Sequence, residues 1–260
     1  MMDHLGITIT EARQAIITGD PQRIPAISDM LGGGKLLSDK RGLVCWEAAD
    51  EKGNATLIVS TGIGGPSTAI VVEELAELGV QTIVRLGTCG GLQKDIIPND
   101  LIIPTGCVRD EGTTAQYIES TFPAVPDFTL TRALLDSLQS SEKKCHIGIV
   151  HCKDAYYMEH ADRQLLPENV SLRWKMLQKA GVVATEMESS TLFVIGSIRR
   201  LRVGSVLIAI GSQPDPQGFS SAMEMAISAI SAAFSSLPDL QYSAETMQNP
   251  RHSYLEKGVD

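Results

Sequence analysis

One stretch of the chain, residues 57–91, combines glycine-rich segments with an arginine inside an apolar run. The glycines at 62, 64 and 65 lack a Cβ atom, so the backbone of segment 61–65 can approach a ligand closely. Arg85 interrupts the apolar run 82–86 and stands beside a second glycine-rich segment, 87–91. A guanidinium at the carboxyl end of a buried parallel strand is costly unless an anion meets it. The stretch therefore predicts a site for an anionic small molecule.

The elements that must position this site follow an alternating pattern. Apolar and β-branched runs predict strands at 14–18, 43–48, 55–60, 82–86, 101–108, 146–152 and 203–211. Helical spacing of apolar residues predicts helices at 67–78, near 130–140, and at 171–180, 187–200 and 220–234. Glycine and proline predict a turn at 87–91 and a loop at 213–218. This alternation favours an α/β fold with a parallel or mixed sheet and helices on both faces.

Length and composition narrow the class of protein. The 260 residues, 43% hydrophobic and 20% charged, suit one α/β domain with a substantial core. A net charge of −9 argues against a general nucleic-acid binder. The five scattered cysteines include no CxxC pair, which favours reduced thiols over a disulfide framework or a zinc site. With no basic leader and no membrane-length apolar run, we expect a cytoplasmic protein without a membrane partner.

Several motifs resemble the uridine phosphorylases, within the wider nucleoside phosphorylase family. They occur in family order: TGDPQR (18–23), STGIGGPSTAIVVEELAELG, RLGTCGGLQ, FPAVPDF (122–128), HCKDAYY (151–157) and TEMESSTLF (185–193). The resemblance implies a three-layer phosphorylase fold, with a central mixed, partly barrel-like sheet flanked by helices. It would occupy residues 1–238, and the polar tail 239–260 is expected to be poorly ordered.

The resemblance implies reversible phosphorolysis of a pyrimidine nucleoside, with inorganic phosphate as co-substrate and no metal or organic cofactor. Arginine forks suit phosphate. The phosphate-binding positions implied by the resemblance are Gly19, Arg23, Arg85, Thr88 and, lent by a neighbouring subunit, Arg41. The alternative for Arg23 and Arg41 is a solvated surface position. The working unit is expected to be a homodimer at least, and members of the family that the chain resembles often form hexamers.

The ribose is expected at Glu186, Met187 and Glu188, with His4 reaching it from the neighbouring subunit. A carboxylate suits vicinal hydroxyls because it accepts a hydrogen bond from each. On a helix, the two glutamates would point in different directions and would not form a catalytic carboxylate pair. The favourable position of an acidic residue at a helix N-terminus would explain Glu186 without any ligand.

The base is expected at Tyr156, Glu159, Arg163 and Ile210, with Arg85, Glu188 and Arg163 carrying catalysis. At position 159 the resemblance predicts a glutamine. A glutamine both donates and accepts, whereas an ionised glutamate only accepts. Glu159 would oppose a base that leaves with negative charge, unless Glu159 is protonated, is neutralised by Arg163 or faces elsewhere. Lys153 and Asp154 are interpreted as a local structural pair near this segment.

Three other functions stay open at this point. Purine phosphorylases of the superfamily place an aspartate near the position of Ile210, and here Asp215 lies five residues further on. Related hydrolases use water and commonly lack the phosphate-binding arginines, which this chain retains. A non-catalytic nucleoside-binding paralogue would account for the altered base site.

Overall fold

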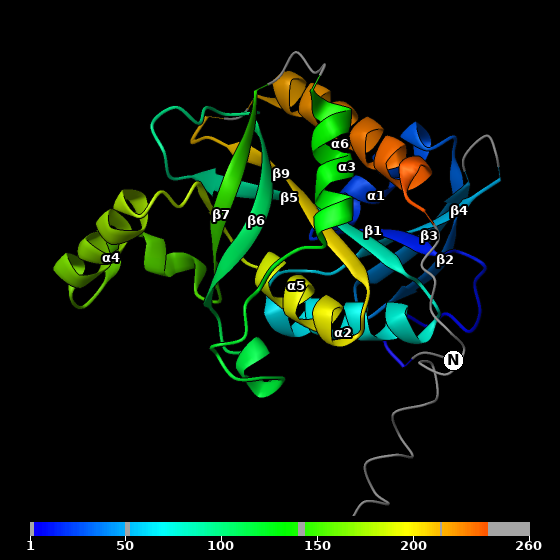
Figure 1. The fold of residues 1–260 in the computed structure, drawn as a ribbon, viewed down its shortest axis with the longest axis horizontal. Coiled ribbons are helices and arrows are strands. Elements are labelled where there is room, and N and C mark those ends of the chain that lie inside the picture. Colours follow the sequence, from blue (N-terminus) through cyan, green and yellow to red (C-terminus); the bar gives the residue numbers. More distant parts are fainter. Residues whose placement is uncertain (1–2, 50–52, 140–143, 214, 239–260) are drawn as a thin grey trace, which may run out of the picture.

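The computed structural model describes residues 3–49, 53–139, 144–213 and 215–238, and the predicted tail 239–260 lies outside them. A nine-stranded mixed sheet lies between two layers of helices (Figure 1). The strands are β1 Gln14–Thr18, β2 Gly34–Lys40, β3 Leu43–Ala49, β4 Ala55–Ser60, β5 Thr82–Gly91, β6 Leu101–Asp110, β7 Cys145–Lys153, β8 Ala184–Glu186 and β9 Arg202–Ile210. The α-helices are α1 Ile24–Met30, α2 Gly65–Glu77, α3 Phe128–Leu138, α4 Pro167–Lys179, α5 Ser189–Ile198 and α6 Pro216–Ser236. Short 3-10 helices are η1 Pro21–Arg23, η2 Thr114–Gln116, η3 Tyr156–Glu159 and η4 Ala161–Arg163.

Part of the sheet closes into a five-stranded ring. The ring runs β5–β8–β7–β6–β9 and returns to β5 through the parallel β5–β9 pairing. The remaining strands extend from β5 in the order β1, β4, β3, β2. The predicted fold, a mixed and partly barrel-like sheet flanked by helices, is therefore confirmed.

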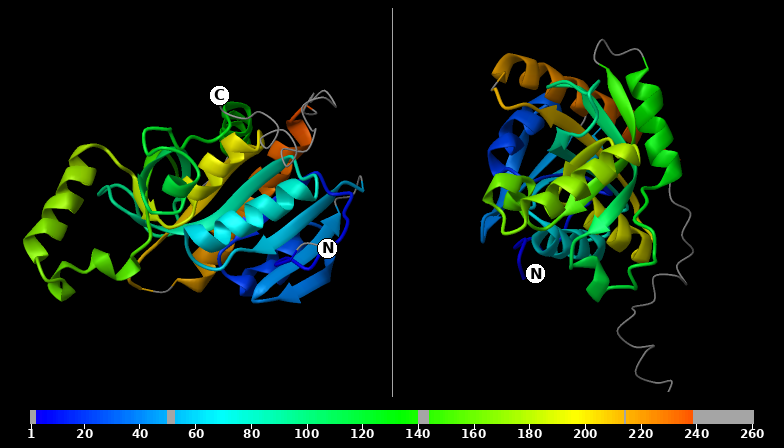
Figure 2. Two further views of the ribbon diagram at one scale, coloured as in Figure 1. Left: turned by 90° about the horizontal axis from the view of Figure 1, so that it is seen from below. Right: turned by 90° about the vertical axis from the view of Figure 1, so that its left-hand side faces the viewer.

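Three apolar cores hold the layers together. Alternate residues of β1 face opposite ways: Ile16 packs with the core under α1, α3 and α6, and Ile17 with the core under α2 and α5. This alternation follows from the two-residue period of a strand. A third core fills the ring with one or two residues from each of its strands, namely Cys89, Ile102, Val150, Ala184, Leu207 and Ala209. Figures 1 and 2 show the helical layers and α4 at the far end from β2.

Four sequence predictions of local structure are wrong. Residues 87–91 continue β5 instead of forming a turn, because β9 pairs with that strand as far as Gly90. Arg85 consequently lies inside β5 and not at its carboxyl end. Glu186 ends strand β8, and α5 begins only at Ser189. Helix α6 begins at Pro216, inside the predicted loop, since Asp215 caps it.

Besides the short 3-10 helices, three elements were not predicted: helix α1, strand β2 and the three-residue strand β8. Helix α1 follows η1 directly, and strand β2 is a largely exposed edge strand whose polar residues weaken the strand pattern. In the described part of the chain, no helix is both long and apolar enough to cross a membrane.

Candidate functional site

The Arg85 guanidinium is held between two glutamates. Its Nε atom lies 3.1 Å from Oε2 of Glu186, and its Nη2 atom lies 2.5 Å from Oε2 of Glu188. Burial acts to lower the pKa of Arg85, but the two carboxylates outweigh it and raise that pKa, so the side chain stays charged. The remaining nitrogen, Nη1, is buried and has no hydrogen-bond partner among the described residues. A buried charged donor without a partner fits the predicted anion site.

Gly87 makes room for this guanidinium. A Cβ atom at position 87 would lie 2.5 Å from Cζ of Arg85 and 2.9 Å from its Nη1. Contacts this short would force the guanidinium to move, so the missing side chain at Gly87 keeps Arg85 in place.

Glu186 is fully occupied by the protein. Its Oε2 accepts the N–H of Glu188 at 2.9 Å, and its Oε1 accepts the N–H of Ser189 at 3.0 Å. These bonds satisfy the first free N–H groups of α5, the role that a helix N-terminus offers an acidic residue. With Arg85 on the same carboxylate, Glu186 positions the arginine, and no oxygen of Glu186 is left without a protein partner for the ribose contact that was predicted for it.

Glu188 connects Arg85 to the first glycine-rich segment. Its Oε1 accepts the N–H of Gly64, which precedes α2, at 2.6 Å. Burial raises the pKa of the Glu188 carboxyl, and the Arg85 charge offsets that effect only in part. The two glutamates approach different nitrogens of one guanidinium, so both carboxylates turn toward Arg85. The expectation that they point in different directions on a helix is wrong, because Glu186 ends strand β8 and α5 begins only at Ser189.

Arg23 approaches the same place from η1. Its Cζ atom lies 5.4 Å from the ring centroid of Phe219 on α6, a cation–π contact that the sequence did not reveal. Burial is the main cause that lowers the pKa of Arg23, and the charges of Arg85 and Glu188 both act on it. Arg23 is therefore a partly buried member of the site and not a solvated surface residue.

Gly19 and Thr88 belong to the neighbouring strands β1 and β5, Gly19 just after the end of β1 and Thr88 within β5. Gly19 directly follows β1, whose Ile17 pairs with Arg85 of β5, and Thr88 stands three residues further along β5. A Cβ atom at Gly19 would lie 3.2 Å from the carbonyl oxygen of Gly62, so a side chain there would crowd the backbone. The structure thus places Arg23 beside Arg85, and it places Gly19 and Thr88 along the neighbouring strands β1 and β5, all within one chain.

Arg41 and His4 do not join them. Arg41 is exposed in the tight turn between β2 and β3, with φ of 57°. The His4 Nδ1 atom lies 2.7 Å from Oε1 of Glu74 on α2, and Glu74 also accepts the backbone N–H groups of His4 and Leu5. Burial would raise the pKa of Glu74, but these bonds lower it. Neither residue contacts the site residues of its own chain among the interactions described, and the role predicted for both in a neighbouring subunit's site stays a prediction.

Three of the predicted base residues, Tyr156, Arg163 and Ile210, are exposed, and Glu159 is half-buried. Tyr156 is 52% exposed, and its ring contacts the Tyr157 ring edge to face with the two ring centroids 5.3 Å apart. Ile210 is 52% exposed at the end of β9. Met187 is half-buried between β8 and α5. Arg163 is exposed on η4, and no ion pair joins it to Glu159 within the described chain.

Lys153 is the site residue that sequence reasoning missed. Its Nζ atom lies 2.5 Å from Oε1 of Glu159 and 2.8 Å from Oγ1 of Thr185. The expected pairing of Lys153 with Asp154 is wrong, since Asp154 accepts the N–H of Gly112. A signal was available: a lysine that continues an apolar strand will be buried with it and needs a partner.

Asp215 has a structural role. Its Oδ1 accepts the N–H of Gly218 at 3.0 Å, and its Oδ2 accepts from Nδ2 of Asn99 at 2.7 Å. An aspartate occupied as the N-cap of α6 is not placed to protonate a leaving purine at Ile210.

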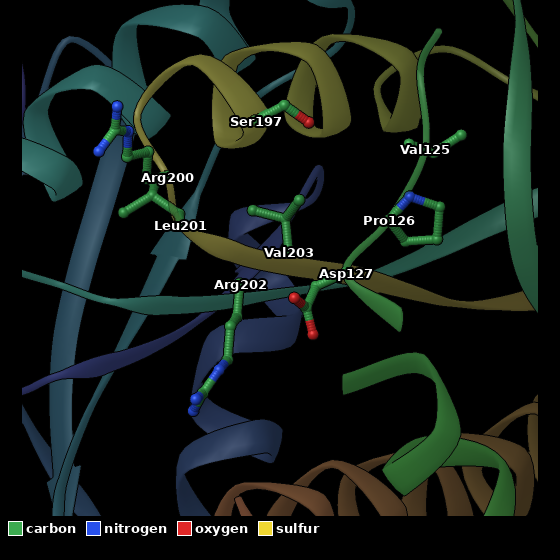
Figure 3. A pocket seen from close by; sticks show the side chains of 8 residues that line it. All are labelled: Val125, Pro126, Asp127, Ser197, Arg200, Leu201, Arg202 and Val203. Carbon is green, nitrogen blue, oxygen red and sulfur yellow. The ribbon is translucent and has the colours of Figure 1, made fainter. Parts of the chain in front are cut away.

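A cavity of about 260 Å³ lies elsewhere, at the amino end of β9 (Figure 3). It is lined by Val125, Pro126, Asp127, Ser197, Arg200, Leu201, Arg202 and Val203. None of these lining residues is among those that contact Arg85.

Known proteins are similar in sequence to this chain over most of its length. Residues 13–237 match the model of the family described as the Phosphorylase superfamily. A uridine phosphorylase of Treponema pallidum is 39% identical over 212 residues, which are 81% of this chain and 82% of that protein. A uridine phosphorylase of Salmonella typhimurium is 37% identical over 78% of this chain and 83% of its own length. A guanosine phosphorylase of Halorubrum lacusprofundi is 35% identical over 76% of this chain and 78% of its own length.

Proposed function

The chain belongs to the phosphorylase superfamily, and from that premise we propose that it catalyses the reversible phosphorolysis of uridine. The observation that carries the proposal is the buried Nη1 atom of Arg85, which has no hydrogen-bond partner in the part of the chain that the structure describes. Such a donor needs an anionic partner, and inorganic phosphate is the co-substrate that this reaction requires. The similarity to two uridine phosphorylases supports the pyrimidine nucleoside.

In the proposed complex, phosphate binds Arg85, Arg23, Thr88 and the backbone at Gly19. The ribose hydroxyls donate to Glu188, which must be ionised to accept from both. Because Glu188 also contacts Arg85, one guanidinium aligns the phosphate with the sugar that it attacks.

A phosphate oxygen forms a bond to the anomeric carbon as the bond from that carbon to the base nitrogen breaks. The electron pair of the broken bond leaves with the base. Negative charge on phosphate and Glu188 stabilises the positive charge that develops on the ribosyl group. The products are ribose 1-phosphate and the free base, which takes up a proton from water. The reaction needs no metal or organic cofactor.

The proposed working unit is a homodimer or a larger oligomer. Arg41 and His4 point to this because neither reaches the Arg85 cluster of its own chain. We place the protein in the cytoplasm, in agreement with five free cysteines.

The test is base release from uridine, thymidine, cytidine and inosine, each with and without phosphate. Release from uridine that requires phosphate supports the proposal. Release without phosphate would identify a hydrolase instead. Preference for inosine would favour the purine reaction, for which the guanosine phosphorylase relative is the supporting observation.

A further inference from the structure

Lys153 is a buried ammonium group next to the proposed ribose site. Its side chain is 7% exposed, and Glu159 and Thr185 account for two of its three N–H groups. Thr185 directly precedes Glu186, which holds Arg85. The Lys153 charge acts on the Glu188 carboxyl and favours its ionised form. A buried lysine in this place is unusual enough to require a function or a dedicated set of partners.

A directed chain of hydrogen bonds holds the lysine in place. Nε2 of His151 lies 2.8 Å from Oδ2 of Asp110, a carboxylate that also pairs with Arg173. Because an ionised carboxylate only accepts, Nε2 carries the hydrogen and Nδ1 is left as an acceptor. Nδ1 lies 3.0 Å from Oγ1 of Thr185, so the threonine hydroxyl donates to it. The lone pairs of that hydroxyl are then left for Lys153.

His151 stays neutral in this arrangement. Burial is the main cause that lowers its pKa to about 4, and the Lys153 charge adds to the effect. Within the pH range of ordinary enzyme assays, the hydrogen-bond directions from Lys153 to Asp110 are therefore constant.

Two groups remain available to a ligand. One N–H of Lys153 and Oε2 of Glu159 have no hydrogen-bond partner within the described chain. Glu159 is 28% exposed on the segment that also carries Tyr156, so this carboxylate is accessible from outside. The ion pair therefore presents one donor directly beside one acceptor.

We propose that Lys153 and Glu159 act together as a donor–acceptor pair that binds the lactam edge of the nucleobase. A lactam places a carbonyl oxygen, which accepts, beside a ring N–H, which donates, as in uracil. Cytosine places a ring nitrogen acceptor beside an amino group and so presents the opposite pattern. The assignment rests on the proposed function, and it names Lys153 as a specificity-determining residue.

The pair also explains how a glutamate is tolerated beside a leaving base. An isolated carboxylate would repel the negative charge that develops on the base. Lys153 neutralises that carboxylate, so the base meets a pair without net charge. Arg163 is not needed for this neutralisation.

The experiment is a double-substitution cycle with Lys153→Met, Glu159→Gln and the two combined. Methionine keeps the length of the lysine stem without charge, and glutamine supplies a donor and an acceptor within one amide. Lys153→Met should lower kcat/KM for uridine about 10²-fold, because Glu159 is left unneutralised. The double variant should recover to within about 10-fold of the wild type, since no unpaired charge remains. Lys175→Met, on the exposed side of α4, is the matched control and should change nothing.

Two readouts separate base recognition from folding and from the proposed function. The first is the ratio of kcat/KM for uridine to that for cytidine. The second is thermal stabilisation by uracil and by cytosine in the presence of phosphate, which needs no turnover. A purely structural Lys153 would lower the melting temperature without changing either preference.

The outcomes are distinct. Uracil stabilisation that is lost in Lys153→Met and regained in the double variant supports the pair, even if the wild type turns over no nucleoside and the proposed function fails. An active wild type whose Lys153→Met variant keeps its uridine-to-cytidine ratio overturns the pair while the proposed function stands. A double variant no better than Lys153→Met also overturns it.

Discussion

The Nη2 atom of Arg85 lies 2.5 Å from Oε2 of Glu188, with both side chains almost fully buried. Through this contact the arginine proposed to bind phosphate also orients the carboxylate proposed to bind ribose. Because Glu186 occupies Nε and Glu188 contacts Nη2, Nη1 is the guanidinium nitrogen that has no partner in the described residues and is left for the phosphate. The two substrates are thereby aligned by one planar group, and changes at Arg85 should affect both.

Replacing Arg85 with lysine keeps a positive charge between the glutamates but removes the planar fork. We expect kcat/KM for phosphorolysis to fall about 10²-fold or more, with the protein still folded. Arg85→Ala should lose activity and also cost about 3–5 kcal/mol of stability, because two buried carboxylates lose their partner. Base-release assays and urea unfolding measure the two effects. Arg132→Ala, which removes an exposed arginine of α3, is the control. A fully active Arg85→Lys enzyme would remove the arginine from the mechanism.

Gly87→Ala tests the space that the guanidinium occupies. The added methyl would lie within 3.0 Å of three guanidinium atoms, so Arg85 must move. A displacement of about 1 Å in a substrate-positioning group lowers the rate about 10²-fold. Gly106→Ala is the control, since its nearest neighbour would be a carbonyl oxygen at 3.4 Å. We would measure kcat/KM and the melting temperature of both variants. Equal kcat/KM values for the two would show that the Arg85 guanidinium can move aside without loss of activity.

Glu188 should control the acid limb of the pH–rate profile. The ionised form accepts the ribose hydroxyls, and burial raises the pKa of this carboxyl above its ordinary value of 4.5. Activity should therefore fall as pH decreases, starting at a higher pH than for an exposed glutamate. The same shift means that the folded protein binds this proton more readily than the unfolded chain, so this group's contribution to stability declines as pH rises through its folded pKa. Glu188→Gln should remove the acid limb and lower kcat/KM at all pH values. An unchanged limb in this variant would assign it to another group.

His151 should make the protein less stable in mild acid. Its pKa is about 4 in the folded protein against an ordinary 6.5, so the unfolded chain binds the proton more readily. The free energy of unfolding should therefore decrease as pH falls from about 6.5 to about 4, and this group adds no further loss below that range. His151→Gln should show a shallower decrease over this interval in urea unfolding. Parallel curves for the two proteins would mean that His151 is not buried in its neutral form.

Mixed oligomers test whether Arg41 completes a neighbouring site. Arg41→Asn removes the guanidinium while tolerating the left-handed backbone at this turn. Arg41→Asn and Glu188→Gln homo-oligomers should both be weakly active. After subunit exchange, a mixed dimer contains one site with Glu188 from one chain and Arg41 from the other, so activity should rise. If mixing yields only the average of the two parents, Arg41 acts within its own chain or not at all.

Local patterns in the sequence determined much of the architecture. Runs of β-branched residues located strands β1, β4 and β7, and the apolar run around Arg85 showed that a charge is buried there. These features depend on neighbours along the chain, whose spacing is visible in the sequence. The ordered motifs also indicated the family to which the chain belongs. The edge strand β2 was not predicted, because an exposed strand needs no apolar pattern.

The partner of each buried charge was decided only by the tertiary structure. Closure of the ring from β5 to β9 brings β8 between β5 and β7, which places Thr185 against Lys153 and Glu186 against Arg85. The sequence suggested the nearest charge, Asp154, for Lys153, but Asp154 lies just beyond the end of β7 and accepts the N–H of Gly112 instead. The fold also gives the two neighbouring glutamates different partners. The Glu186 carboxylate accepts the N–H of Ser189 at the start of α5, whereas the Glu188 carboxylate contacts the N–H of Gly64 and the Arg85 guanidinium. A buried charge pairs with whatever the fold packs against it, and that choice depends on segments far apart in the chain.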